Sequence, residues 1–221
     1  MKLSASVMCA DLLHLADELE KLKDAGIDEL HLDIMDGHFV PNIMLSTELG
    51  KRLKNQAIPR DFHLMVENPG PMLPWFLPGE GDVFSLHVES APDLHGAFDY
   101  LHRQGALCAL ALSPQTPLSA MEPYLPQLDR ILMMTVPPGR AGQPMAPGSL
   151  ERIAAARDYL AAHGKPLPIQ VDGHCSPDMI PKMAMAGASN FVLGTSALFR
   201  SDRTIAQGAA IVRKALEGIE G

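Results

Sequence analysis

Eight short apolar segments alternate with longer segments of helical periodicity along the whole 221-residue chain. Strands are expected at residues 2–7, 28–33, 60–65, 82–88, 107–112, 129–135, 167–172 and 190–194. Repeated strand–helix units are typical of a parallel sheet, and eight of them fit a closed barrel better than an open sheet. The sequence therefore predicts one α/β domain over residues 1–221, a single (β/α)₈ TIM barrel.

The connecting segments carry helical patterns with two interruptions. Helices are predicted at residues 11–23, 46–55, 92–104, 148–163, 177–186 and 202–217. In the first of these, Asp11 is the expected N-cap, and one apolar stripe is formed by Leu12, Leu15, Leu19 and Leu22. Prolines restrict the third and fifth connections, at 69–78 and 117–126, to short or broken helices, because proline removes a backbone donor.

The composition excludes several classes of function. A formal net charge of −8 argues against a general nucleic-acid binder, since the phosphate backbone would be repelled. The first twenty residues turn acidic too early for a signal peptide, and no apolar run approaches the roughly 20 residues that a membrane helix needs. The three cysteines have wide spacings and no CxxC pair, which favours reduced thiols in the cytoplasm.

Four residues with metal-binding side chains fall at the predicted C-terminal ends of strands, where TIM barrels place their active sites. His31 and Asp33 are two residues apart on one strand, so their side chains point to the same face. His63 ends the next strand, and Asp172 ends the seventh. Each residue alone could be an ordinary hydrogen-bonded side chain, but the four together predict a site for a divalent cation such as zinc or ferrous iron. His38 and His87 lie near the same strand ends, and their roles are left open.

Glycine-containing loops after two strands predict an anion site. Residues 137–143 (PPGRAGQ) follow the sixth strand, and residues 193–196 (LGTS) follow the eighth. Glycine lets backbone N–H groups approach a phosphate, and a helix N-terminus after the eighth strand would add a favourable dipole. Three methionines at strand ends are expected to form an apolar wall beside the metal: Met35, Met65 and Met134.

At these same segments the sequence resembles the ribulose-phosphate 3-epimerase family. The similar motifs are SASVMCADL, HLDIMDGHFVPN, FHLMVENP, LSPQTPL, MMTVPPGRAGQ, VDG and GTSALF, and they run through nearly the whole chain. SASVMC, AGQP and GTSALF are slightly more similar to the D-allulose-6-phosphate 3-epimerase branch. The resemblance implies a barrel of the ribulose-phosphate-binding type and a homo-oligomer, from dimer to hexamer. It also implies 3-epimerisation of a small phosphorylated ketose, either D-ribulose 5-phosphate/D-xylulose 5-phosphate or D-allulose 6-phosphate/D-fructose 6-phosphate.

The resemblance also implies roles for individual residues. One divalent ion (Zn²⁺ or Fe²⁺, with Mn²⁺ or Co²⁺ as further candidates) would be held by His31, Asp33, His63 and Asp172, and Asp33 and Asp172 would be the acid/base pair. The substrate contacts would be Ser6, His63, Met35, Met65 and Met134. The phosphate contacts would be Gly139, Arg140, Ala141, Gly142, Gly173, His174, Gly194, Thr195 and Ser196. The sequence departs from the family pattern at Pro137, Arg140, Ala141 and His174, which leaves the substrate's chain length open.

The expected mechanism removes the proton from C3, next to the ketone, and returns one on the opposite face, with the cation stabilising the enediolate. Two other functions are compatible with the same barrel architecture. A decarboxylase or aldolase would need a lysine near the carboxylates, and none occurs between Asp28 and Ser46 or beside Asp172. A sugar-phosphate sensor without catalysis would have no need for two carboxylates on a metal.

Overall fold

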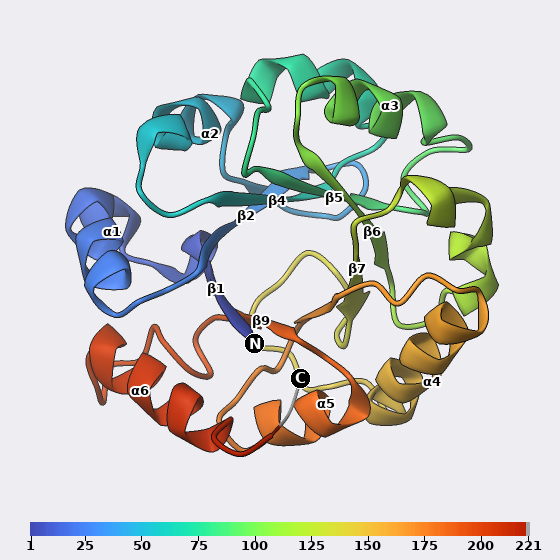
Figure 1. The fold of residues 1–221 in the computed structure, drawn as a ribbon. Helices are drawn as coiled ribbons and strands as arrows, with labels where there is room; N and C mark the ends of the chain where they lie inside the picture. Colours follow the sequence, from blue (N-terminus) through green and yellow to red (C-terminus); the bar gives the residue numbers. More distant parts are fainter. Residues whose placement is uncertain (220–221) are drawn as a thin grey trace.

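A closed barrel of parallel strands forms the centre of the protein in the computed structural model, which describes residues 1–219 (Figure 1). The barrel strands are β1 (Lys2–Ser6), β2 (Glu29–Asp36), β4 (Arg60–Met65), β5 (Val83–His87), β6 (Leu107–Leu112), β7 (Arg130–Met134), β8 (Ile169–Asp172) and β9 (Asn190–Leu193). Each pairs in parallel with the next, and β1 pairs with both β2 and β9, which closes the sheet. The predicted TIM barrel is confirmed. Glu220 and Gly221, the end of the predicted domain, lie outside the described residues.

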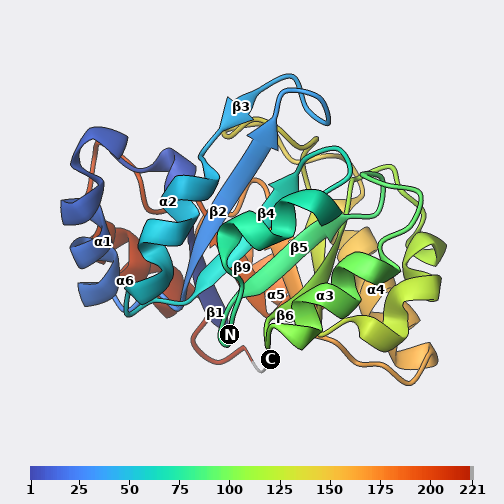
Figure 2. The same cartoon turned by 90° about the horizontal axis from the view of Figure 1, so that it is seen from above.

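One short strand was not predicted from the sequence. β3 (Ile43–Met44) pairs antiparallel with the end of β2, where Met35 lies opposite Met44. The resulting hairpin extends β2 three residues past its predicted end at Asp33 and rises above the rest of the barrel (Figure 2). A two-residue strand is too short to show the alternation of apolar and polar residues by which strands are found in a sequence.

Helices surround the barrel in the predicted segments (Figure 1). The α-helices are α1 (Leu15–Asp24), α2 (Thr47–Arg52), α3 (His95–Arg103), α4 (Ser149–Ala162), α5 (Ile180–Ala186) and α6 (Ile205–Ala215). The two proline-rich connections form 3₁₀ helices, η4 (Gly70–Phe76) and η5 (Leu118–Gln127), as the missing backbone donors of proline lead one to expect. Within residues 1–219, no helix is both long and apolar enough to cross a membrane.

The first helix begins later than predicted. The Asp11 side chain accepts a hydrogen bond from the backbone N–H of Leu13, but it caps a 3₁₀ turn, η2 (Leu12–His14), and α1 starts only at Leu15. A 3₁₀ turn has three residues per turn instead of 3.6, so it rotates Leu12 off the apolar stripe. Leu12 is 44% exposed, whereas Leu19 and Leu22 are buried against the barrel.

Paired polar side chains fill the barrel interior near the N-terminal ends of the strands. Arg130 donates through Nη1 to Glu29 at 2.7 Å and through Nη2 to Asp61 at 2.5 Å. The Gln170 amide also donates to Asp61, at 2.6 Å, and the Asn190 amide donates to Glu29, at 2.8 Å. We call this group the lower cluster; its members are Ser4, Glu29, Asp61, Arg130, Gln170 and Asn190. None of them is more than 6% exposed.

Candidate metal centre

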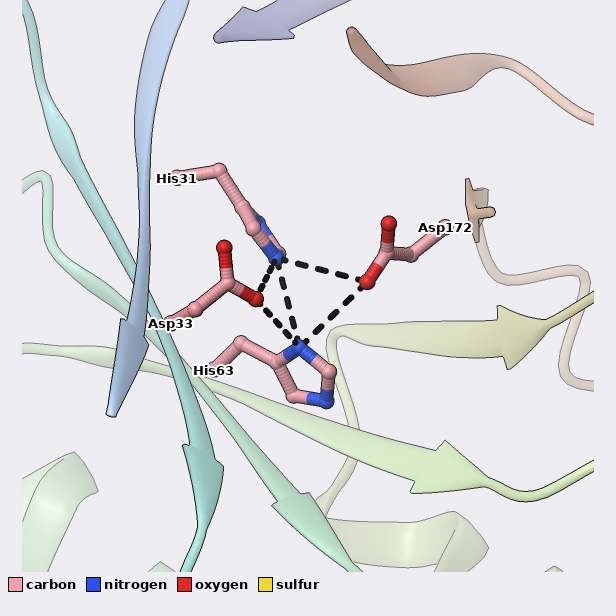
Figure 3. Close-up of side chains that lie close together, drawn as sticks. All are labelled: His31, Asp33, His63 and Asp172. Carbon is pink, nitrogen blue, oxygen red and sulfur yellow. Dashed lines mark hydrogen bonds and ion pairs between the residues drawn. The ribbon is translucent and has the colours of Figure 1, made fainter. Parts of the chain in front are cut away.

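Four side chains that the sequence singled out converge at the C-terminal ends of the strands (Figure 3). His31 and Asp33 come from β2, His63 from β4 and Asp172 from the last position of β8. The register of β2 and β4 places Asp33 directly opposite His63. All four offer a ligand atom within 4.8 Å of the others.

The distances between these ligand atoms fit a single small cation. His31 Nε2 lies 3.3 Å from His63 Nδ1, 3.5 Å from Asp33 Oδ1 and 3.9 Å from Asp172 Oδ2. His63 Nδ1 lies 3.3 Å from Asp33 Oδ1 and 3.5 Å from Asp172 Oδ2. Metal–ligand bonds of about 2.0–2.2 Å in a tetrahedral site place neighbouring ligand atoms roughly 3.3–3.6 Å apart. The donor set, two imidazoles and two carboxylates, therefore suits zinc or ferrous iron in both size and chemistry.

The centre holds two carboxylates and no permanent positive charge. Asp33 is 3% exposed, and within the described residues neither Asp33 nor Asp172 pairs with a lysine or arginine. Burial raises the pKa of Asp172, and the Asp33 carboxylate raises it further. Burial also opposes ionisation of Asp33, but the His31 and His63 imidazoles outweigh it and hold the pKa of Asp33 below its ordinary value. A divalent cation would neutralise the pair.

His31 is oriented by the lower cluster. Its Nδ1 lies 2.7 Å from Asp61 Oδ2, while the other oxygen of Asp61 accepts from Arg130. Because an ionised carboxylate can only accept, Nδ1 carries the proton, which leaves Nε2 free as a metal ligand. In the metal-free centre burial disfavours a charged imidazole, but Asp61 and Asp33 raise the pKa of His31 well above its ordinary value, so a metal would bind Nε2 in place of a proton. Asp61 was not foreseen as a site residue, although it precedes His63 by two positions and so shares its face of β4.

His87 and His38, which the sequence left open, have different positions. The His87 ring is fully buried, and its Nε2 lies 2.9 Å from Nε2 of His63. His38 is exposed, and its backbone N–H donates to the side chain of Asp36 in the turn that follows β2.

A cavity of about 240 Å³ adjoins two of the four ligands, Asp33 and Asp172. Of the predicted catalytic and substrate-contacting residues, those that line it are Ser6, Asp33, Met35, Met65, Met134 and Asp172. All the predicted phosphate contacts line it too: Gly139, Arg140, Ala141, Gly142, Gly173, His174, Gly194, Thr195 and Ser196. His63 is fully buried and is not one of the residues that line the cavity, so its direct contact with the substrate stays a prediction.

The wall beside the metal centre combines polar and apolar groups. Ser6 donates a hydrogen bond of 2.8 Å to Oδ2 of Asp33, the oxygen that does not face the two histidines. Met35, Met65 and Met134 are at most 4% exposed, as expected for an apolar wall. Cys9 also lines the cavity and was not predicted as a site residue, although it lies in the SASVMC motif beside Ser6.

Two of the glycines expected to contact phosphate, one after β7 and one after β8, let the backbone approach the cavity. Gly139 and Gly173 have φ of 104° and 111°, where side chains other than hydrogen are strained. A Cβ at Gly173 would lie 2.7 Å from Val136 Cγ2, and one at Gly139 would lie 2.9 Å from Val40 Cβ. No other residue type could bring the backbone this close to both the cavity and its neighbours.

The helix predicted after the eighth barrel strand is present as α6, but its N-terminus does not line the cavity. The segment after β9 forms a tight turn in which the backbone N–H groups of Ala197, Leu198 and Phe199 all donate to the Gly194 carbonyl. α6 begins only at Ile205, where Thr204 and Gln207 form a capping box. The turn places Gly194 against Cys9, since a Cβ there would meet Sγ at 3.2 Å.

A second group of potential ligands, His102, Cys108 and Asp129, lies near the starts of β6 and β7. The Cys108 thiol is directed at the Phe98 carbonyl at 3.5 Å, and burial raises its pKa well above the ordinary value. A thiol held neutral is a poor metal ligand. All three cysteines of the described chain are free, as predicted.

Comparison with known proteins identifies relatives over most of the chain. Residues 2–199 match the profile described as the ribulose-phosphate 3 epimerase family. The ribulose-phosphate 3-epimerase of Bacillus subtilis is 34% identical over 205 residues, which cover 92% of this chain and 94% of that protein. The enzyme of the same name from Methanocaldococcus jannaschii is 35% identical over 203 residues, covering 91% of this chain and 86% of that protein.

Solved structures of similar shape are more distant in sequence. A crystal structure of KGPDC from Streptococcus mutans has a TM-score of 0.75 at 12% identity, covering 99% of this chain and 98% of that chain. 3-Hexulose-6-phosphate synthase from Salmonella typhimurium has a TM-score of 0.72 at 13% identity, with 100% of both chains covered. At such low identity these likenesses show the TIM-barrel fold alone.

Proposed function

From the premise that this chain belongs to the ribulose-phosphate 3-epimerase family, and so is an enzyme that epimerises a ketose phosphate at C3, we propose that it works through one divalent metal and two aspartates. His31, Asp33, His63 and Asp172 hold the metal, and Asp33 and Asp172 exchange protons with the substrate. The observation that carries the proposal is the convergence of four ligand atoms, two of them carboxylate oxygens, beside a cavity.

The metal is zinc or ferrous iron, with manganese and cobalt as further candidates. When bound, a divalent ion would supply a Lewis acid, which would lower the cost of taking the proton from C3. Two histidines favour the later first-row metals over magnesium or calcium, which prefer oxygen ligands.

The two carboxylates divide the proton transfers between them. Asp33 starts as the base and takes the C3 proton on one face of the sugar. Asp172 starts as the acid and supplies a proton on the other face. The roles reverse in the return reaction. Ser6 supports this assignment, because its hydrogen bond to Oδ2 fixes the orientation of the Asp33 carboxylate.

The phosphate of the substrate binds to the glycine loops that line the cavity. Backbone N–H groups near Gly139, Gly173 and Gly194 are the expected donors, and Arg140 and His174 add side chains on the same loops. The chain belongs with enzymes named for ribulose phosphate, so D-ribulose 5-phosphate is the substrate we propose. D-Allulose 6-phosphate is the second candidate, on the motif similarities of its branch.

Proton exchange at C3 tests the catalytic proposal. In deuterated water, the wild type should incorporate deuterium at C3 of the ketose phosphate that it converts. Asp33→Asn and Asp172→Asn should each reduce turnover at least about 10³-fold, since a two-base inversion fails when either base is missing. Asp28→Asn, which removes a partly exposed carboxylate paired with Arg213, is the matched control and should leave turnover unchanged.

Substantial activity of either active-site variant on every substrate would contradict the two-base mechanism. A comparison of kcat/KM for ribulose 5-phosphate, allulose 6-phosphate and a tetrulose phosphate decides the chain length. We also propose a homo-oligomer, from dimer to hexamer, which light scattering on the purified protein would measure.

A further inference from the structure

We propose that His87 and Glu89 form a positioning pair that holds His63 in the one tautomer able to bind the metal. The chain of contacts runs from Nδ1 of His63, through its ring to Nε2, then to Nε2 of His87 at 2.9 Å. From there it continues through the His87 ring to Nδ1, which lies 3.0 Å from Oε2 of Glu89. The inference rests on the proposed metal centre, and neither His87 nor Glu89 lines the cavity.

The Glu89 carboxylate, at the end of this series of contacts, is held in place by further hydrogen bonds. Oε1 of Glu89 accepts from the backbone N–H of Ser113 at 2.9 Å and from the Thr116 hydroxyl. Arg152 of α4 in turn donates to the carbonyl oxygens of Ser113 and Thr116, which holds this loop against Glu89. Burial opposes ionisation of Glu89, but these donors and His87 lower its pKa to about 2. Glu89 is therefore an ionised acceptor at neutral pH.

The positions of the ring protons on His87 and His63 follow from the negative charge of Glu89. Because Glu89 can only accept, Nδ1 of His87 must donate, and a neutral His87 then has a lone pair on Nε2. That lone pair accepts only if Nε2 of His63 carries a proton. His63 is then left with its lone pair on Nδ1, the atom that faces His31, Asp33 and Asp172. The tautomer of each ring is thus assigned from the hydrogen-bond network.

His87 is well placed to remain neutral. It is fully buried, and Phe39 packs on its ring with centroids 4.9 Å apart. The ring also stacks with His63 at 5.0 Å and 26°. A ring buried between Phe39 and His63 is poorly solvated, which disfavours the charged imidazolium. A protonated His87 would have no lone pair and could not accept from His63.

The two metal-binding histidines are consequently held in opposite tautomers. Nδ1 of His31 contacts the Asp61 carboxylate directly, and its Nε2 faces the metal site. Nε2 of His63 is linked to the Glu89 carboxylate through the His87 ring, and its Nδ1 faces the metal site. Outer partners of this kind fix ring orientation, and their removal typically costs about 10- to 100-fold in metal affinity. The same cost is expected here for a residue that never touches the metal.

Zinc affinity tests the pair directly. Zinc binding to metal-free protein is measured by competition with a chromophoric chelator for three variants. His87→Phe keeps a ring of similar shape but no acceptor, and its zinc dissociation constant should rise about 10- to 100-fold. His87→Gln keeps an acceptor near the position of Nε2 and should restore most of the affinity. His14→Phe, which removes an exposed histidine paired with Asp11, is the matched control and should bind zinc like the wild type.

The histidine tautomers provide a readout that needs no variant. In ¹⁵N-labelled wild type, two-bond ¹H–¹⁵N correlation spectra should show His87 neutral with its proton on Nδ1, both with and without zinc. With zinc bound, His63 should be protonated on Nε2 and metal-bound through Nδ1. A proton on Nε2 of His87 would overturn the inference, as would a His87→Phe variant that binds zinc as tightly as the wild type.

Failure of the metal centre itself has a different signature. Wild-type protein that binds no zinc, iron, cobalt or manganese would refute the proposed function, whereas the His87 tautomer in metal-free protein would still report on the pair. Thermal unfolding of each metal-free variant shows whether a loss of affinity merely reflects a loss of fold. Loss of zinc binding only in proportion to unfolding would count against a positioning role.

Discussion

The two ends of the barrel interior both bury ionisable groups, but they balance charge in different ways. In the lower cluster, Arg130 lies between Glu29 and Asp61, and Lys2 adds a partly exposed ammonium 2.8 Å from Glu29. At the metal centre, the only basic side chains that pair with Asp33 and Asp172 within residues 1–219 are imidazoles. The lower cluster carries permanent counter-charges, whereas the metal centre has none among the described residues.

This difference separates a structural cluster from a reactive one. Burying a charge is costly unless a partner compensates it, so Glu29 and Asp61, which share the guanidinium of Arg130, can remain ionised permanently. Two close carboxylates without a fixed cation are unfavourable until something positive binds, and they can also gain or lose protons. Charge balance, more than burial, distinguishes the two ends.

Removal of the metal should have the largest effect. Chelation should abolish epimerisation, and zinc, ferrous iron, cobalt or manganese should restore it, because the two carboxylates cannot by themselves stabilise charge on the substrate. Zinc at about 100 times its dissociation constant should also stabilise the fold by about 2.7 kcal/mol. Turnover in the presence and absence of chelator measures the first effect. Full activity in metal-free protein would contradict the proposed difference between the metal centre and the lower cluster.

Removal of the counter-charge from the lower cluster should have the next largest effect. Arg130→Met should lower the free energy of unfolding by about 3–5 kcal/mol, since it leaves Glu29 and Asp61 buried without their cation. Arg213→Met is the control, because Arg213 is 44% exposed and its pair with Asp28 is worth about 1 kcal/mol or less. Urea unfolding followed by circular dichroism compares them, and equal losses would show that the lower cluster is not held by this charge.

Backbone shape should matter more at the metal-binding end. Gly173→Ala combines a positive φ with contact to Val136 and should destabilise the protein by about 1–3 kcal/mol and weaken phosphate binding. Gly81→Ala also has a positive φ, 85°, but nothing lies within 4 Å of its Cβ, so a loss of about 1 kcal/mol is expected. Urea midpoints and KM should differ between the variants. A smaller loss for Gly173→Ala would contradict the close approach.

A small gain in stability should follow when one carboxylate is removed from the metal-free centre. Asp172→Asn should stabilise metal-free protein at pH 7 by on the order of 1 kcal/mol, because it relieves repulsion from Asp33. The folded state raises the pKa of Asp172, so its ionisation opposes folding at neutral pH, and this cost fades as pH falls toward the ordinary value of about 3.9. Thermal melts at pH 7 and pH 4 measure the gain; a loss at pH 7 would mean that the charges are already balanced.

The parts of the fold that the sequence predicts are those with a local signal. Strands such as β6 (Leu107–Leu112) are buried along nearly their whole length and read as continuous apolar runs, as parallel barrel strands do. The spacing of His31 and Asp33 places both on one face of β2 without any knowledge of the partners. The short β3 and the 3₁₀ turn at Leu12 depend on one or two residues, so no periodic pattern shows them.

The network around the metal ligands could not be predicted in the same way. Arg130 and Glu29 are 101 residues apart, and their pairing requires β2 and β7 to face each other across a closed barrel. The contact between His63 and His87 likewise depends on how β4 and β5 are placed. A sequence without its relatives shows which residue types are available for chemistry, but a three-dimensional arrangement is needed to show which of them share a proton.

Asp61 belongs to both ends of the barrel, since one of its oxygens accepts from Arg130 and the other from His31. A library of random variants should therefore contain substitutions of Arg130 or Gln170 that lower the enzyme's activity because they misalign His31. Some of these variants should still be expressed at normal levels. A redesign of the lower cluster for heat tolerance should therefore retain Asp61. Epistasis between Arg130 and His31 would be the genetic trace of that shared carboxylate.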